Sequence, residues 1–146
     1  MKSAPIIAAA VSVLAVAVPT RPSRSAPSID SQVTFLYYKD VAAAAQFYGG
    51  ILGLEQTFDE GWVEIYRISS TSYVGLVDET RGSHRASESK PVMLSIVTDE
   101  VDAWYEHIRS ADVTILSEIS DGTAVPVRSF MVEDPGGYTV EFFRWR

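Results

Sequence analysis

The chain has 146 residues, of which 47% are hydrophobic and 21% are charged, a balance that is ordinary for one globular domain. Its formal net charge is −7 and no basic stripe runs along it, so nucleic acid is not an expected partner. The absence of cysteine excludes disulfides, thiolate metal sites, cysteine nucleophiles and lipidation at cysteine.

The N-terminal segment differs in character from the rest of the chain. Lys2 supplies a positive start, residues 5–18 form an apolar run, and Ala15-Val16-Ala17 offers a small-residue cleavage site. These features predict a signal peptide over residues 1–18, because the run is shorter than the roughly 20 residues that span a bilayer. Residues 19–31 predict a flexible linker. We therefore expect an exported protein, periplasmic or extracellular, without a stable membrane span after cleavage. An uncleaved membrane tether and a misassigned start codon are the alternatives.

Residues 32–146 contain a faint internal repeat. In the first half, about residues 32–80, an expected strand over 33–38 leads into a helix from Ala42 to about Tyr48. Two further strands are expected after this helix, over residues 62–68 and 71–77. Asp40 can cap the helix through its side-chain oxygen.

The second half, about residues 91–146, follows the same order. An expected strand over 93–98 leads into a helix from Asp102 to about Ser110, with Asp99 or Thr98 as its cap. Further strands are expected over residues 113–116, 128–132 and 138–143. Neither half could bury a core alone, so the two halves must pair.

Residues 131–145 are the most informative stretch. Residues 134–137 (DPGG) predict a turn, because proline presets φ for a turn's second position and a glycine can take the left-handed conformation that follows. In the strand beyond the turn, a period of 2 places Glu141 and Phe143 on one face and Phe142 on the other. Glu141 is therefore expected to point into a cavity, with a solvated carboxylate on an edge strand as the alternative.

The repeated βαβββ unit, with FYGGILGLE after the first helix and EDPGGYTVEFF at the end, resembles the vicinal oxygen chelate superfamily. That superfamily includes glyoxalase I, bleomycin-resistance proteins, fosfomycin-resistance enzymes and extradiol dioxygenases. The resemblance covers nearly everything after residue 32 and implies an α+β fold. Two paired βαβββ modules would form a curved mixed sheet around a cavity, with helices on the outer face. Because related chains often complete their pockets across a dimer interface, the resemblance also implies a homodimer.

Enzymes of this family usually hold a divalent metal, with ligands at the start of each module's first strand and in each module's last strand. With residues 73–77 aligned to residues 138–142, these positions carry over to Val33, Leu76, Met93 and Glu141. Only Glu141 can bind a metal, whereas catalytic zinc needs about three protein ligands. Neither histidine, His84 or His107, occupies a matching position. We therefore expect no family-type metal and no cofactor, with a divalent metal held by other residues as the alternative.

The remaining candidate is an apolar, aromatic pocket between the modules with one carboxylate, a composition typical of a small-molecule site. Its expected lining residues are Val33, Phe35, Tyr37, Leu76, Met93, Ser95, Glu141 and Phe143. Glu141 could pair with a cationic group of the ligand or act as a general base beside an acidic C–H. An ion pair with Arg67 or Arg128, without functional meaning, is the alternative.

The loop between the modules carries Arg81, His84 and Arg85, which could fold over the pocket mouth and bind an anion. A solvated connection is the simpler interpretation of this loop. Two functional classes therefore stay open: a metal-free protein that binds a small, partly aromatic molecule, and an enzyme. The enzyme would be a lyase, isomerase or dioxygenase similar to the metal-using relatives, or a metal-free variant with Glu141 as its base.

Overall fold

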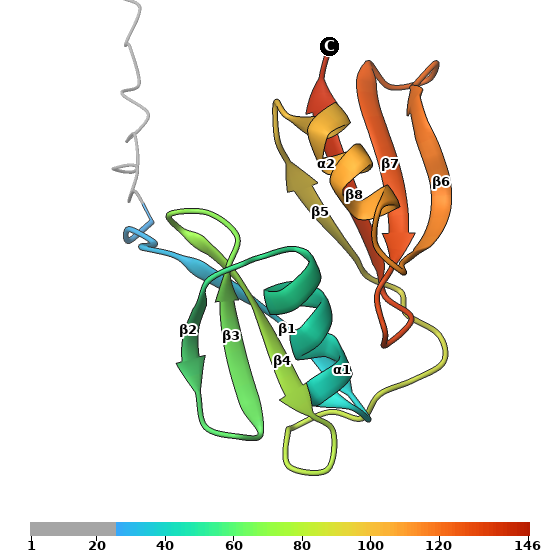
Figure 1. Ribbon diagram of the computed structural model, residues 1–146. Coiled ribbons are helices and arrows are strands. Elements are labelled where there is room, and N and C mark those ends of the chain that lie inside the picture. Colours follow the sequence, from blue (N-terminus) through green and yellow to red (C-terminus); the bar gives the residue numbers. More distant parts are fainter. Residues whose placement is uncertain (1–25) are drawn as a thin grey trace, which may run out of the picture.

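The computed structural model describes residues 26–146, which form two units of strand, helix and three strands (Figure 1). The expected signal peptide over residues 1–18 and most of the expected linker over 19–31 lie outside the described residues. Within residues 26–146, no helix is long and apolar enough to cross a membrane.

The first module contains one four-stranded sheet and one helical segment. Its strands follow the order β1-β4-β3-β2, with β1 parallel to β4 and the other pairs antiparallel. The elements are β1 (Gln32–Tyr38), α1 (Val41–Ala45), the π-helix η1 (Gln46–Ile51), β2 (Gln56–Asp59), β3 (Val63–Arg67) and β4 (Ser72–Asp78). The expected helix thus continues to Ile51 as a π-helical turn. The strand β2 was not expected, because it is short and exposed throughout.

The second module repeats this arrangement, with strand order β5-β8-β7-β6 and with β5 parallel to β8. Its elements are β5 (Met93–Val97), α2 (Val101–Arg109), β6 (Thr114–Asp121), β7 (Val127–Glu133) and β8 (Thr139–Trp145). The α+β fold of two βαβββ modules is therefore confirmed. The strands lie in two separate sheets.

The two helices begin differently. The Asp40 side chain accepts a hydrogen bond of 2.9 Å from the backbone N–H of Ala43, as the sequence predicts. The N-cap of α2 is Glu100, whose side chain makes no capping bond. The Thr98 hydroxyl accepts the Glu100 N–H at 3.2 Å, ahead of the helix. The expectation that Asp99 caps α2 was wrong, because the helix begins one residue beyond its reach.

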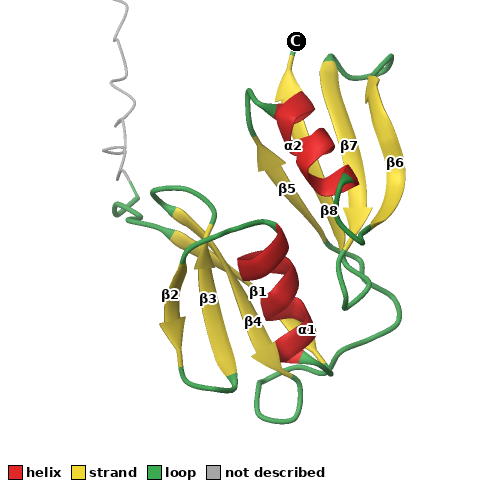
Figure 2. Ribbon diagram, viewed as in Figure 1, coloured by secondary structure: helices red, strands yellow, loops and turns green. Residues whose placement is uncertain are grey.

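Each helix covers one face of its own sheet (Figure 2), and alternate strand residues fill the space beneath it. In β8, Val140 and Phe142 are fully buried. The Phe142 ring stacks between the rings of Phe130 and Trp104, with centroids 5.1 Å apart in both pairs. The apolar alternation of the strands therefore builds the core on the helix side.

The other side of each sheet has no helix over it, and we call these two sides the open faces. The register of the strands assigns the residues to them. On the first sheet, the open face carries Val33, Phe35, Tyr37, Ile65, Tyr73 and Gly75. On the second sheet, it carries Met93, Ser95, Val97, Met131, Glu141 and Phe143.

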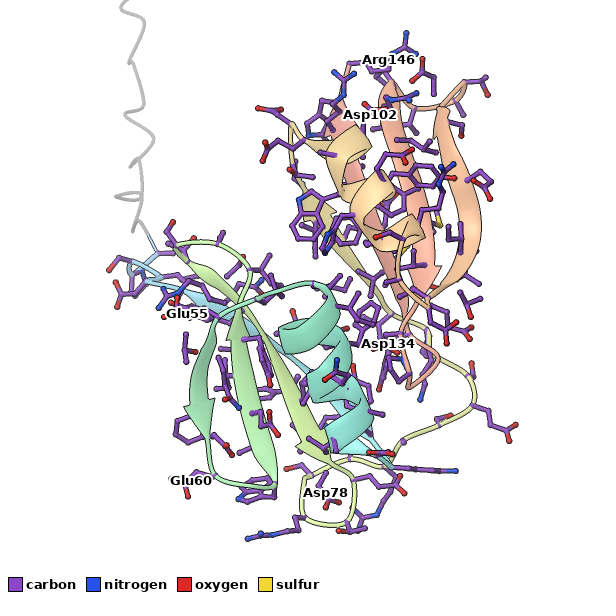
Figure 3. All side chains as sticks on the ribbon, in the orientation of Figure 1. Glu55, Glu60, Asp78, Asp102, Asp134 and Arg146 are labelled. Atoms are coloured by element: carbon purple, nitrogen blue, oxygen red, sulfur yellow. The ribbon has the colours of Figure 1, made fainter. Side chains whose placement is uncertain are left out.

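The modules are joined by a buried hydrogen-bond cluster around Asp134, which Figure 3 places between them. Asp134 is 3% exposed and accepts hydrogen bonds from the Tyr38 hydroxyl at 2.6 Å and the Tyr48 hydroxyl at 3.0 Å. Its other oxygen accepts the backbone N–H of Tyr138 at 2.9 Å. Burial raises the pKa of Tyr38 and Tyr48 well above its ordinary value, so both remain protonated donors. We call Tyr38, Tyr48, Asp134 and Tyr138 the joint.

Further contacts between the modules also lie on their helix sides. The His107 ring of α2 makes a hydrogen bond of 2.7 Å with the carbonyl oxygen of Ile51, the last residue of η1. A cleft of about 380 Å³ separates α1 and η1 from residues 112–114 and 133–135 of the second module. The helix sides of the modules therefore meet within one chain. The open faces lie on the opposite sides of their sheets.

Candidate functional site

The first sheet places one expected pocket residue on the wrong side. Leu76 pairs with Leu36 in the parallel register of β1 and β4 and is completely buried under α1. The expectation that Leu76 lines the pocket was therefore wrong. Gly75 pairs with Phe35 in the same way that Glu141 pairs with Ser95, so Gly75 holds the position equivalent to Glu141. The alignment of the two halves was off by one residue, and a shift of one residue moves a side chain to the other face.

Glycine at position 75 has a packing consequence. A Cβ atom at this position would collide with the ring of Phe35, which lies across the glycine. The Phe35 side chain nevertheless remains 48% exposed. Gly75 thus lets an aromatic ring lie flat on the open face, where the second module instead has a carboxylate.

Glu141 lies on the open face of the second sheet, on the side of β8 opposite the buried Phe142. The Ser95 hydroxyl donates a hydrogen bond of 2.7 Å to its Oε2 atom. Met131 is its neighbour across the β7–β8 pair. Ser95, Glu141 and Met131 therefore form a polar centre with an apolar neighbour on this face.

Neither arginine that could have neutralised Glu141 pairs with it. Arg67 pairs with Glu55 at 2.9 Å and donates to the Tyr73 hydroxyl at 3.2 Å. Arg128 lies on the helix side, where it pairs with Asp102 of α2 at 2.6 Å and with Asp121 at 3.1 Å. Within the described part of the chain, Glu141 has no ion pair, so the arginine alternative for its role was wrong.

A pocket of about 260 Å³ opens on the first sheet. Its walls include the aromatic rings of Phe35 and Tyr37 from β1, Phe58 from β2, and Trp62 immediately before β3. The loop that follows β4 forms one side of it through Arg81, Gly82 and Ser83. The residues expected in the pocket did not include Trp62. A tryptophan that directly follows a glycine turn and precedes a strand was the available signal for a rim position.

The three residues expected in a lid make different contacts. The Arg81 guanidinium lies over the Trp62 ring, 5.3 Å from its centroid. The His84 ring packs edge-on against Tyr37 at 5.1 Å. The Arg85 guanidinium instead donates to backbone carbonyl oxygens of its own loop, among them that of Glu79. The loop therefore folds against the open face of the first sheet, with Arg81 as the cation that reaches the pocket.

The structure does not bring all the expected pocket residues together in one chain. Phe35 and Tyr37 line the pocket on the first sheet, and a neighbouring cavity of about 370 Å³ extends from them to residues 84–92 and Tyr138. Met93, Ser95, Glu141 and Phe143 lie on the open face of the second sheet. The two groups stand on the open faces of two different sheets.

The positions that carry the metal in related enzymes now become Val33, Gly75, Met93 and Glu141. They offer one oxygen donor, which does not fit a site that needs about three protein ligands. Across residues 26–146, no three His, Cys, Asp or Glu side chains gather closely enough to hold an ion. His84 and His107 are engaged with Tyr37 and with the Ile51 carbonyl oxygen respectively.

Comparison with known proteins gives a family match and many similar structures. Residues 30–142 match the family model described as the Glyoxalase/Bleomycin resistance protein/Dioxygenase superfamily. Comparison with curated proteins finds no match.

Among solved structures, a glyoxalase/bleomycin resistance protein/dioxygenase from Nocardioides has a TM-score of 0.67 at 19% identity, covering 84% of this chain and 87% of its own. A lactoylglutathione lyase from Agrobacterium tumefaciens has a TM-score of 0.62 at 22% identity, covering 82% and 95%. A virulence protein from Salmonella typhimurium has a TM-score of 0.65 at 17% identity, covering 84% and 100%. At these identities the similarity shows a shared fold.

Proposed function

Because this chain belongs to the Glyoxalase/Bleomycin resistance protein/Dioxygenase superfamily, we propose that it binds a small, partly aromatic molecule on its open faces, without the usual metal. The observation that carries this proposal is the exposure of large apolar side chains on both open faces. Phe35 is 48% exposed, Met93 45% and Val97 61%. Large apolar side chains that stay exposed on one face of a sheet favour a site for a ligand or a partner.

The metal-free part of the proposal follows from the donor set. Val33, Gly75 and Met93 have no side-chain oxygen, nitrogen or thiolate to offer, so Glu141 is the single donor at the four positions. A second copy of the chain would bring the same residue types to these positions. Association of two copies therefore leaves the family-type site with one ligand.

We propose that a homodimer closes the pocket. β1 ends the first sheet and β5 ends the second, so each has one edge without a neighbouring strand in its sheet. A free edge is a template for pairing with another chain. A two-fold dimer would place the open face of the first sheet of one copy against the open face of the second sheet of its partner, and would do so twice. Each pocket would then combine Phe35 and Tyr37 with Glu141 and Ser95.

In that pocket, Glu141 would orient the ligand. Its Oε2 atom is engaged by Ser95, and within the described residues its Oε1 atom has no hydrogen-bond partner. A carboxylate oxygen of this kind accepts a hydrogen bond from an amine, amide or hydroxyl group. Export to the periplasm or the extracellular space remains part of the proposal and rests on the sequence of residues 1–18.

The Glu141 carboxylate, whose Oε1 atom has no hydrogen-bond partner within the described residues, also favours one alternative. This alternative is a metal-free enzyme in which Glu141 acts as the general base. A base must lie within hydrogen-bond reach of the proton that it removes. The change Glu141→Gln distinguishes the alternatives once a ligand is known. An unchanged Kd with loss of turnover supports the enzyme, and an absence of turnover in the unchanged protein supports the binding protein.

The proposal is tested by thermal unfolding of the full chain with uncharged aromatic probes, 2-naphthamide and indole. Binding to the native state raises the Tm by mass action. We expect 2-naphthamide to raise the Tm, and EDTA to leave that increase unchanged. Phe35→Ser should abolish the increase. Val125→Ser is the matched control, because Val125 is 51% exposed in the turn between β6 and β7. The absence of any increase, or one bound metal per chain on which folding depends, would contradict the proposal.

A further inference from the structure

The walls of the pocket on the first sheet are mostly aromatic and aliphatic. Phe35, Phe58 and Trp62 contribute aromatic rings, and Ile65 lies on the same face beside Gly75. The volume of about 260 Å³ is smaller than a typical site for a drug-sized molecule. Aromatic walls favour offset or edge-on contact with another ring. The pocket therefore fits a flat molecule of one or two fused rings.

One charged side chain lines this pocket, and it is a cation. Arg81 lies at the rim, and its guanidinium is held 5.3 Å from the centroid of the Trp62 ring. Within the described residues, Arg81 has no ion pair. Two carboxylates close to it in sequence accept other hydrogen bonds: Asp78 from the N–H and hydroxyl of Thr80, and Glu79 from the N–H of Ala86. The hydrogen bonds from Thr80, and to a smaller extent the charges of Arg81 and Arg85, lower the pKa of Asp78.

The loop that carries Arg81 is fixed in place by its own packing. The backbone N–H groups of Arg81 and Gly82 both donate to the carbonyl oxygen of Asp78, at 3.1 Å and 2.9 Å. A Cβ atom on Gly82 would lie 2.5 Å from the Val77 side chain and 2.7 Å from the Tyr37 ring, so the loop backbone touches the open face and a larger residue would force the loop or these side chains to move. Figure 3 shows Asp78 at the start of this loop, at the end of the first module. The guanidinium is thus preorganised beside an aromatic pocket.

We propose that this pocket binds a planar aromatic carboxylate. The ring lies among Phe35, Phe58 and Ile65, and the carboxylate pairs with the Arg81 guanidinium and the Ser83 hydroxyl at the rim. Arginine suits this role because its fork of N–H groups matches the two oxygens of a carboxylate. This inference rests on the proposed function, since it names the class of ligand that the open face receives.

The test compares a charged probe with a neutral one of the same shape. Isothermal titration of the full chain measures the Kd of 2-naphthoate and of 2-naphthamide. We expect 2-naphthoate to bind about tenfold more tightly, because a hydrogen bond to a charged group is stronger than its neutral counterpart. Arg81→Gln should remove that advantage and leave the Kd of 2-naphthamide unchanged.

Arg109→Gln is the matched control, because Arg109 has an exposed side chain on α2 and the variant has the same net charge as Arg81→Gln. It should bind both probes as the unchanged protein does. Gly82→Ala is an independent variant, since the added Cβ must push the loop off Tyr37. It should weaken 2-naphthoate more than 2-naphthamide.

The outcomes separate the two proposals. Equal Kd values for the two probes, or Arg81→Gln binding 2-naphthoate as tightly as the unchanged protein, would overturn the carboxylate site while the aromatic pocket stands. If neither probe binds, both the carboxylate site and the proposed binding function fail.

Discussion

The two faces of each sheet are made from the same strands and differ in almost every other respect. Leu36 and Tyr38 of β1 are buried on the helix side, whereas Phe35 between them is 48% exposed on the open face. In β8, Phe142 is buried and its neighbours Glu141 and Phe143 are accessible. The helix side holds the fold together and joins the modules. The open face presents equally large side chains that the fold of one chain does not use, which is why we assign it to ligand and partner.

The sharpest test of this contrast compares two adjacent phenylalanines. Phe142→Ala should lower the free energy of unfolding by about 3–5 kcal/mol, because it leaves a cavity in the core. Phe143→Ala should cost less than about 1.5 kcal/mol, because its ring is only partly buried on the open face. Guanidinium unfolding of both variants measures the difference, and equal costs would contradict the division into two faces.

A substitution in the joint tests whether contacts on the helix sides connect the modules. Asp134→Ala leaves two buried tyrosine hydroxyls and two backbone N–H groups without their acceptor, at Gly136 and Tyr138. We expect a loss of about 3 kcal/mol in unfolding free energy. Glu133→Ala is the neighbouring control, since Glu133 is exposed and should change stability by less than about 0.5 kcal/mol. A loss for Asp134→Ala as small as that of the control would contradict a stabilising role for the joint.

The tyrosines of the joint predict a weakness at alkaline pH. The pKa of Tyr38 and Tyr48 is raised by burial in the folded state, so their contribution is fully present below the unfolded value of 10.0. Above that pH the unfolded chain loses these protons and the folded chain keeps them. Stability should therefore fall by about 1.4 kcal/mol per pH unit for each tyrosine.

Urea unfolding between pH 9 and pH 11 measures that slope. Tyr48→Phe should reduce the slope, because the unfolded chain then has no Tyr48 hydroxyl proton to lose. A slope that Tyr48→Phe leaves unchanged would contradict the assignment of the effect to these buried tyrosines.

The smallest expected loss of stability comes from changes at the N-termini of the two helices. Asp40→Ala removes the side-chain cap of α1 and should cost about 1 kcal/mol. Asp99→Ala lies ahead of α2, where the side chain makes no capping bond, and should cost less than about 0.5 kcal/mol. Thermal unfolding of the two variants checks this order, and a larger loss for Asp99→Ala would reverse it.

The repeated order of elements and the alternation within β8 were predictable from the sequence, because periods of 2 and 3.6 are local properties of the chain. The sequence did not predict which residues of β4 face the core. Tyr73 resembles Tyr138, yet packing under α1 decides that Leu76, and not Gly75, faces the core. Similar residue types in two strands do not fix which side each strand turns inward.

The joint and the pocket could not be predicted, for a different reason. Asp134 belongs to a turn signal, and nothing near it in sequence indicates that tyrosines 86 and 96 residues away donate to it. The rim position of Arg81 likewise depends on how its loop packs against Tyr37 and Trp62. Such contacts depend on the tertiary fold and produce no repeating pattern in the sequence.

Open faces from two copies should together form each ligand site, and mixing two variants of the chain tests this. Phe35→Asp places a charge on the open face of the first sheet, and Met93→Asp places one on the open face of the second sheet. Neither variant alone should bind 2-naphthamide with the affinity of the unchanged protein. After the two are mixed in equal amounts and allowed to exchange partners, we expect about a quarter of the sites of the unchanged protein, since half the dimers are mixed and each has one intact site. A mixture that binds no more than its separate components would contradict the account.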